Sequence, residues 1–301
     1  MRNVLSLLNT NEVIMTQEII QTQIIDGKKL ASQIEAGLKE EISTFERKLG
    51  MAVVLVGDNP ASLIYVNHKK KAAERLGIDA QIYHLSPVMT QDALISFIHE
   101  LNANDTVDGI IVQLPLPKHF DENAVIEAID PNKDIDGLHP LNMGRLFIGQ
   151  PHLIACTPLA CLRLLKEVYT DLVGKTVVVV GRSRLVGKPV LQLLLNEQCT
   201  VIQAHSKTQD LASLCRTADI IISATGTAGL IKRDFVKKGA VLIDVGIIRT
   251  ADKKITGDVA FDEMMGHAHA VTPVPGGVGP MTVMMLLSNV VQAYKTNHLN
   301  K

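Results

Sequence analysis

Aromatic residues are scarce in this sequence, which has no tryptophan and only 3% Phe, Trp and Tyr among its 301 residues. This scarcity argues against the aromatic platforms on which nucleic-acid bases stack. Positive charge is not in excess either, because the formal net charge is −1. A surface without excess positive charge suits neither nucleic acid nor an anionic membrane. We therefore expect neither of these partners.

Cysteines are also few, and no two of them form a C-x-x-C pair. They lie in apolar or helical contexts, as small buried residues of a reducing compartment do. Their spacing does not suit a structural zinc site, and His267 with His269 would supply only two ligands. We therefore expect no metal site. The cysteines are Cys156, Cys161, Cys199 and Cys215.

Long hydrophobic runs are missing, because no segment approaches the roughly 20 apolar residues that a membrane span requires. Residues 1–22 contain only a short apolar run and lack an A-x-A cleavage site, so they make a poor signal peptide. We expect residues 1–22 to be a loosely ordered extension, and the protein to be soluble and cytoplasmic.

Apolar residues are abundant: 47% of the chain is hydrophobic and 20% is charged, which suits buried cores. The length suggests two domains. In residues 23–150 the predicted strands alternate with helices, a pattern typical of a parallel sheet covered by helices. The strands are expected at 51–56, 80–85 and 109–114, and the helices at about 27–50, 60–77, 90–101 and 121–129.

Residues 151–280 repeat the alternation in a doubly wound, nucleotide-binding pattern. Strands are expected at 176–180, 200–204, 219–223, 240–244 and 268–272, and helices at about 157–169, 190–195 and 209–215. We therefore predict an α/β fold with an N-terminal substrate domain on a parallel sheet (23–150) and a C-terminal Rossmann-type domain (151–280). The active-site cleft is expected between them, and a last helix within 281–301 is expected to pack back on the first domain.

Tyr65 and Lys69 are four residues apart in a predicted helix, so their side chains lie on one face. The helix follows the strand at 51–56, and ligands of α/β proteins tend to bind at the carboxyl ends of parallel strands. A solvated helix face is the alternative interpretation, because Lys70 and Lys71 follow directly.

The segment 131–140 resembles neither helix nor strand and carries two carboxylates, Asp134 and Asp136. Its two prolines and Gly137 are compatible with a surface turn. Its position just after the first sheet leaves a ligand-binding role open.

Gly181 and Gly187 frame a turn between a predicted strand and a predicted helix. Such a turn directs backbone N–H groups and a helix dipole at a pyrophosphate. The turn departs from the usual G-x-G-x-x-G, with Ser183 at the middle position and one residue more before the last glycine. The strand before it and the helix after it support a dinucleotide site.

NADP is favoured over NAD by the stretch 201–207, which has no carboxylate for a ribose 2′-hydroxyl. Arg182, Ser206 and Lys207 can instead donate hydrogen bonds to a phosphate. A solvated loop with incidental basic residues is the alternative.

Further turns follow strand ends at 225–227 and at 246–247, and 274–282 is a glycine-rich loop that opens a helix. Gly276 and Gly277 permit close approach of the backbone to a flat ring. A merely flexible turn is the alternative, but three glycine turns at one sheet edge make it a poor explanation.

Five stretches, in this order, resemble the methylenetetrahydrofolate dehydrogenase/cyclohydrolase family, and the resemblance covers about residues 24–296. They are VGDNPASLIYVNHK (56–69), GIIVQLPLP (109–117), DIDGL (134–138), GRSRLVGKP (181–189) and PGGVGPMT (275–282).

The resemblance implies two reactions: oxidation of 5,10-methylenetetrahydrofolate by NADP⁺, and hydrolysis of the 5,10-methenyl product to 10-formyltetrahydrofolate. It also implies a homodimer. It places Lys69 at the reacting carbon as a proton shuttle, with Tyr65 over it, Gln113 bonded to it and Asp136 holding the pterin. The substrate-binding residues that it implies are Ser62, Tyr65, Lys69, Gln113, Leu114, Pro115, Asp136, Pro275, Gly276 and Gly277. The NADP-binding residues are Gly181, Arg182, Ser183, Val186, Gly187, His205, Ser206, Thr225, Gly226, Ile247, Gly277 and Thr282.

Three other classes fit the sequence less well. The short-chain dehydrogenases also carry Y-x-x-x-K, but after their Rossmann turn, whereas here the pair precedes Gly181. A shikimate-type dehydrogenase has this architecture without the stretches at 113–117 and 275–282. A non-catalytic NADP-binding sensor would be expected to lack Lys69 or Asp136, and both are present.

Overall fold

The structure is a computed structural model that describes residues 20–299, so most of the extension expected at 1–22 lies outside the described residues. The hydroxyl of Thr22 donates to the carbonyl oxygens of Met264 and Ala268 at 3.1 and 2.8 Å. The backbone N–H of Gln23 donates to the carbonyl of His269 at 2.8 Å. The chain is therefore tied to its second half from residue 22 onward.

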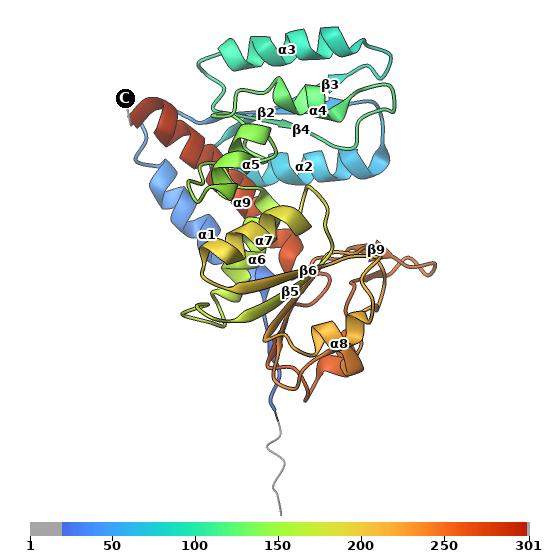
Figure 1. Cartoon of the computed structure of the whole chain (residues 1–301). Helices are drawn as coiled ribbons and strands as arrows, with labels where there is room; N and C mark the ends of the chain where they lie inside the picture. Colours follow the sequence, from blue (N-terminus) through green and yellow to red (C-terminus); the bar gives the residue numbers. More distant parts are fainter. Residues whose placement is uncertain (1–19, 300–301) are drawn as a thin grey trace, which may run out of the picture.

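The first half is built on three parallel strands in the order β3-β2-β4. The central strand is apolar from Met51 to Val56 and buried throughout, as expected for a strand covered on both faces. Helices α3 and α4 cover one face and α2 the other (Figure 1). The elements are α1 (Gly27–Ile42), β2 (Gly50–Val56), α2 (Pro60–Arg75), β3 (Asp79–Leu85), α3 (Gln91–Ala103), β4 (Gly109–Val112), α4 (Glu122–Glu127) and α5 (Pro140–Phe147).

The second half is built on six parallel strands in the order β1-β11-β8-β7-β5-β6. The chain moves from β5 to β6 on one side and then crosses to β7 on the other. This reversal makes the carboxyl ends of β5 and β7 the switch point at which such sheets bind ligands. The two halves, the parallel sheets and the helices that cover them confirm the predicted α/β fold.

The elements of the second half begin with α6 (Cys156–Leu165), β5 (Thr176–Val180), α7 (Gly187–Asn196), β6 (Thr200–Ala204), α8 (Leu211–Cys215), β7 (Ile220–Ser223) and β8 (Val241–Asp244). A small antiparallel pair, β9 (Ile248–Arg249) and β10 (Ile255–Thr256), precedes β11 (Ala270–Val271) and α9 (Val278–Tyr294). The short turns of helix are η1 (Arg233–Phe235), η2 (Phe261–Met264) and η3 (Lys295–Leu299).

The sequence interpretation missed several short elements, among them β1, α5 and the antiparallel pair β9 and β10. Strand β1 (Gln23–Ile24) pairs with β11 in the second sheet, although residue 23 was expected to begin the first domain. Both of its residues are exposed, so the strand carries no hydrophobic pattern. Helix α5 begins at Pro140 with the side chain of His139 as its N-cap, where only a glycine-rich stretch was recognised.

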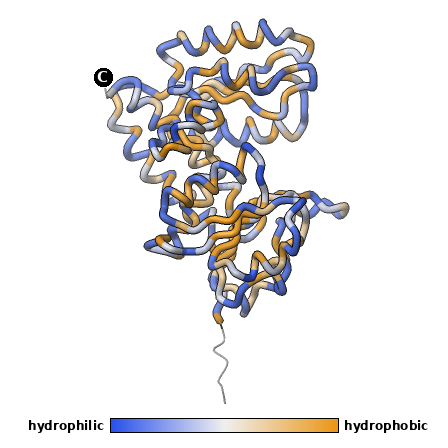
Figure 2. Tube along the Cα trace, viewed as in Figure 1, coloured by the Kyte–Doolittle hydropathy of each residue, from blue (hydrophilic) through white to orange (hydrophobic). Residues whose placement is uncertain are grey.

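The two halves share one core. Successive residues of a strand face opposite sides of its sheet. One face of each sheet contributes to a common buried cluster, which contains Met51 of β2 and Val177 of β5. Figure 2 shows the apolar strands inside and the hydrophilic residues outside. Helix α9 packs against α1 and α6 in this cluster and passes from the second half to the first (Figure 1). No helix among the described residues is long and apolar enough to cross a membrane.

Candidate functional site

Tyr65 and Lys69 lie on α2, which begins where the sequence predicts. The side chain of Asn59 accepts hydrogen bonds from the N–H groups of Ala61 and Ser62, and Pro60 is the first helical residue. The Tyr65 ring is 47% exposed, and Lys69 is half-buried. The helix therefore presents a phenol and an amine along one face, one turn apart.

Lys69 meets Gln113, which directly follows β4. The Nζ of Lys69 donates to Oε1 of Gln113 at 3.0 Å. The Nε2 of Gln113 donates to the carbonyl oxygen of Leu114 at 2.7 Å, so the amide is held with its oxygen toward the lysine. The structure thus brings together two side chains 44 residues apart in the chain.

The two carboxylates of the segment 131–140 have different surroundings. Asp134 is buried, and its Oδ2 accepts from the N–H of His139 at 2.8 Å and from Nδ2 of Asn142 at 2.9 Å. Burial raises the pKa of the Asp134 carboxyl, although these hydrogen bonds lower it. Asp136 is half-buried. Asp134 therefore shapes the loop, and Asp136 is the carboxylate open to a ligand.

Cys156 is a buried thiol next to the segment of Asp136, and the sequence interpretation treated it only as a small buried residue. Burial, followed by the neighbouring Asp136 carboxylate, raises the pKa of its thiol, whereas the Lys69 cation lowers it. Its Sγ lies 3.3 Å from the carbonyl oxygen of Ile135. The buried thiol therefore lies beside the segment that carries Asp136, at the first turn of α6.

A cleft of about 370 Å³ lies between the two halves, with Tyr65 on one wall and the glycine loop 273–277 and the first turn of α9 on the other. Gly276 and Gly277 of this loop are buried, and Pro275 is exposed. The N–H of Lys28, in the first turn of α1, donates to the carbonyl oxygen of Gly276 at 3.1 Å. The glycine loop is therefore fixed to the first half as well as to α9, which it opens.

Three ionisable residues of this cleft were not predicted: Lys28, His68 and Asp244. Asp244 ends β8, and its carboxylate accepts from the N–H groups of Gly246, Asp258 and Val259, each at 2.9 Å. Burial raises the pKa of Asp244 to about 6. A carboxylate at a strand end, directly before a glycine turn, is the sequence signal that could have identified it.

A second cavity, of about 500 Å³, lies at the carboxyl ends of β5, β6 and β7. The turn 181–187 borders this cavity and has no room for a side chain at either of its glycines. A Cβ on Gly181 would lie 2.4 Å from the carbonyl oxygen of Ala224. A Cβ on Gly187 would lie 2.2 Å from the carbonyl oxygen of Gly181. Ser183 Oγ accepts from the N–H groups of Val186 and Gly187 at 3.1 and 3.4 Å and so caps α7. The predicted residues that line this cavity are Gly181, Arg182, His205, Ser206 and Thr225.

Other predicted residues lie elsewhere. Ile247 lines the cleft between the halves and not the second cavity. Thr282 lies in α9, and its hydroxyl is 3.2 Å from that of Thr157. Gly226 is in the exposed turn after β7, and Ser62 is buried near the start of α2. Leu114 and Pro115 follow Gln113, the first half-buried and the second exposed.

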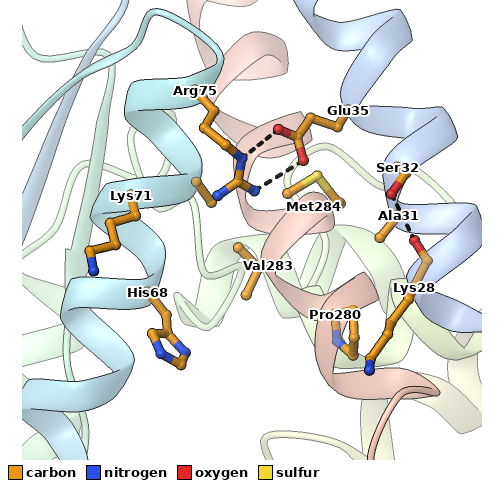
Figure 3. Close-up of a pocket in the computed structure, with 11 residues that line it drawn as sticks. Lys28, Ala31, Ser32, Glu35, His68, Lys71, Arg75, Pro280, Val283 and Met284 are labelled. Carbon is orange, nitrogen blue, oxygen red and sulfur yellow. Dashed lines mark hydrogen bonds and ion pairs between the residues drawn. The ribbon is translucent and has the colours of Figure 1, made fainter.

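A groove of about 350 Å³ adjoins the cleft between α1, α2 and α9 (Figure 3). It shares Lys28 and His68 with the cleft, and Lys71 and Arg75 also line it. The guanidinium of Arg75 pairs with the carboxylate of Glu35 at 2.7 and 3.0 Å. The cleft therefore continues into a surface with basic side chains.

The part of the chain that the structure describes contains no group of three or more His, Cys, Asp or Glu side chains that could hold a metal ion. His267, considered as a ligand from the sequence, has its Nε2 2.7 Å from the carbonyl oxygen of Val236.

Comparison with known proteins gives one family for both halves. The model of the tetrahydrofolate dehydrogenase/cyclohydrolase catalytic domain matches residues 25–136. The model of the NAD(P)-binding domain of the same enzymes matches residues 155–298. The chain is 49% identical over 276 residues to the bifunctional protein FolD of Listeria innocua, covering 91% of this chain and 97% of that protein.

Solved structures agree. The bifunctional FolD methylenetetrahydrofolate dehydrogenase/cyclohydrolase of Campylobacter jejuni superimposes with a TM-score of 0.90 at 45% identity, covering 92% of this chain and 99% of that one. The Trypanosoma brucei enzyme, complexed with NADP and an inhibitor, gives a TM-score of 0.88 at 39% identity, with 92% and 98% covered. The family predicted from the five sequence stretches is therefore confirmed. This chain belongs to the tetrahydrofolate dehydrogenase/cyclohydrolase family of bifunctional enzymes.

Proposed function

We propose that this protein oxidises 5,10-methylenetetrahydrofolate with NADP⁺ and hydrolyses the 5,10-methenyl product to 10-formyltetrahydrofolate, both in the cleft between its halves. The observation that carries the proposal is the 3.0 Å hydrogen bond from Lys69 to Gln113. This hydrogen bond lies on the first half, and Tyr65, on the same helix as Lys69, faces the glycine loop 273–277 across the cleft. Lys69 and Gln113 do not themselves line this cleft, so the folate is proposed to extend past Tyr65 to reach this proton-transfer pair, with the nucleotide half on its other side.

The cavity at the switch point fits a dinucleotide, because Gly181 and Gly187 leave their backbone uncovered where a Cβ would collide with the turn. Arg182 and Ser206 are exposed at its rim and can donate to a 2′-phosphate. Bound there, NADP⁺ would supply the acceptor for the hydride of the methylene carbon. The chain's contribution to this step is alignment, supplied by the turn at 181–187 and by the loop at 275–277.

The other residues expected around NADP have positions that are compatible with cofactor binding. His205 and Thr225 line the same cavity, and Ser183 with Val186 orders the first turn of α7. Gly226, Ile247, Gly277 and Thr282 are proposed to contact the cofactor once it extends from the cavity into the cleft.

In the second reaction Lys69 is the proposed proton shuttle. A lysine is normally protonated at neutral pH, but a bound methenyl cation disfavours a second positive charge beside it. The neutral amine then takes a proton from the attacking water and returns one to the leaving ring nitrogen, as the carbon–nitrogen bond breaks. Gln113 orients the amine, because its own Nε2 is held by Leu114.

The substrate is proposed to be held from several sides. The half-buried carboxylate of Asp136 can accept from the 2-amino and ring N–H groups of a pterin. Tyr65 is exposed, and its ring is proposed to cover the substrate and not to act as the acid. Ser62, Leu114 and Pro115, with Pro275 and the glycines that follow it, complete the proposed lining.

The two domains are proposed to be 23–150 and 151–280, with β1 as a strand that the first domain contributes to the second sheet. The homodimer and the cytoplasmic location stay predictions. Sedimentation of the purified protein would test the first, and fractionation of cells would test the second.

The direct test is to incubate the purified protein with methylenetetrahydrofolate and NADP⁺ and to measure NADPH and 10-formyltetrahydrofolate. Formation of both supports the proposal, and absence of both would refute it. The variant Lys69→Ala should lose about 10²–10⁴-fold in cyclohydrolase rate, the usual contribution of a positioned acid or base, while some hydride transfer persists. Lys70→Ala is the matched control, since Lys70 pairs with Glu74 on the same helix. Undiminished hydrolysis by Lys69→Ala would overturn the proton shuttle.

A further inference from the structure

Asn289 is a buried amide in the middle of α9, and its side chain is 4% exposed. Its Nδ2 donates to the carbonyl oxygens of Ile135 and Ile154, both at 2.8 Å. It also lies 3.7 Å from Sγ of Cys156. Both amide protons are therefore directed at the segments that carry Asp136 and Cys156, far from Asn289 in the sequence.

The other end of α9 belongs to the opposite wall of the cleft. The helix begins at Val278, directly after the glycine loop, and Val278, Gly279 and Pro280 line the cleft. At 1.5 Å per residue, Asn289 lies about 16 Å along the axis from this first turn. The helix is buried against α1 and α6 over most of its length. The single helix α9 therefore connects the glycine loop with the segment 131–140, which we call the Asp136 loop.

We infer that Asn289 is a positioning residue that holds the Asp136 loop on α9 and so sets its distance from the glycine loop. The inference rests on the proposed role of Asp136 in holding the pterin. The carbonyl that Asn289 binds belongs to Ile135, the residue next to Asp136, so little freedom remains between the anchor and the carboxylate. Asn289 would thereby align the substrate with the cofactor side of the cleft.

The Asp136 loop has independent anchors in the first half. Asp134 forms a backbone bridge with Ile110 of β4, and its carboxylate binds His139 and Asn142. Without the Asn289 bonds the loop would stay near Lys69 and Gln113 but would lose its fixed distance from α9. Water attack uses groups of the first half alone, whereas hydride transfer needs alignment across the cleft. Loss of Asn289 should therefore impair the two reactions unequally.

The test compares Asn289→Leu, of similar size but without donors, with the wild-type protein. Displacing a reacting group by about 1 Å can cost on the order of 10²-fold in rate. We expect kcat of the dehydrogenase to fall by about that factor, kcat of the cyclohydrolase to fall far less, and KM for the folate to rise. The Kd of NADP, measured by titration calorimetry, should not change, since Asn289 does not line the cavity beside Gly181 and lies about two turns from Thr282, the residue of α9 proposed to contact the cofactor. Ser288→Ala is the control, because its hydroxyl binds only the carbonyl of Met284 within α9 in the described structure.

A merely structural role would lower both rates together through the amount of folded protein and leave both KM values unchanged. The inference would thus be overturned if the folded variant had the same ratio of dehydrogenase to cyclohydrolase rate as the wild-type protein. Asn289→Ser keeps one donor and makes the same comparison if the leucine variant does not fold, with an intermediate ratio expected. Absence of both activities in the wild-type protein would instead refute the proposed function.

Discussion

Replacing Gly181 by alanine should weaken NADP binding while leaving the hydrolytic reaction in place. The backbone there has φ = +132°, a conformation that residues with a Cβ rarely adopt. The added Cβ would lie 2.4 Å from the carbonyl oxygen of Ala224. Carbon and oxygen normally approach to about 3.3–3.6 Å, so the turn must move by about 1 Å. That movement shifts the N–H groups that are directed at the pyrophosphate.

The size of the effect follows from the strain. A residue held in an unfavourable backbone conformation costs about 1–3 kcal/mol. The free variant relieves this strain by moving the turn, and binding must impose it again. Since about 1.4 kcal/mol corresponds to a factor of ten, we expect the Kd of NADP to rise about 10- to 100-fold. Titration calorimetry measures this Kd directly.

The same variant should hydrolyse methenyltetrahydrofolate at close to the wild-type rate, because Lys69 and Gln113 lie in the other half. Gly37→Ala is the matched control, since a Cβ at that position in α1 meets no atom within 4 Å. Wild-type affinity of Gly181→Ala for NADP would refute the reasoning, because it would mean that the turn between β5 and α7 does not hold the cofactor.

Two further predictions concern stability. Arg47→Met should lower the free energy of unfolding by about 2 kcal/mol, because it leaves the buried Asp108 carboxylate without the guanidinium that is now 2.6 Å away. Urea denaturation followed by circular dichroism measures this free energy, and equal midpoints for the variant and the wild-type protein would contradict the prediction. Burial raises the pKa of Asp244 to about 6, so the folded state holds this proton at a pH where the unfolded state has lost it. Its contribution to stability should therefore fall by about 3 kcal/mol as the pH rises from about 4 to 6, and Asp244→Asn should abolish that slope in urea titrations.

Continuous segments carried most of what could be predicted. The buried strands at 51–56 and 176–180 are largely apolar runs that each end at a glycine, and the structure has them within one residue of the expected limits. The turn at 181–187 is recognisable because strand, glycines and helix follow one another directly. The family was recognisable for the same reason, since each of its five stretches is local.

Elements without a local pattern could not be predicted. The two residues of β1 are exposed and form a strand only because β11 offers an edge. Helix α5 has two glycines in or beside its last turns, which hid the cap at His139 and Pro140. Asp134 and Asp136 look equivalent in the sequence, and only the bonds from His139 and Asn142 distinguish them.

The sequence by itself determined the longer strands, most of the helices, the glycine turn and the family, because each depends on neighbouring residues. The tertiary structure alone decided which distant side chains meet. Lys69 and Gln113 are 44 residues apart, and Asn289 binds a carbonyl 154 residues away. Such contacts depend on how β4, α2 and α9 pack in space, and hydrophobic periodicity within a segment carries no information about that packing.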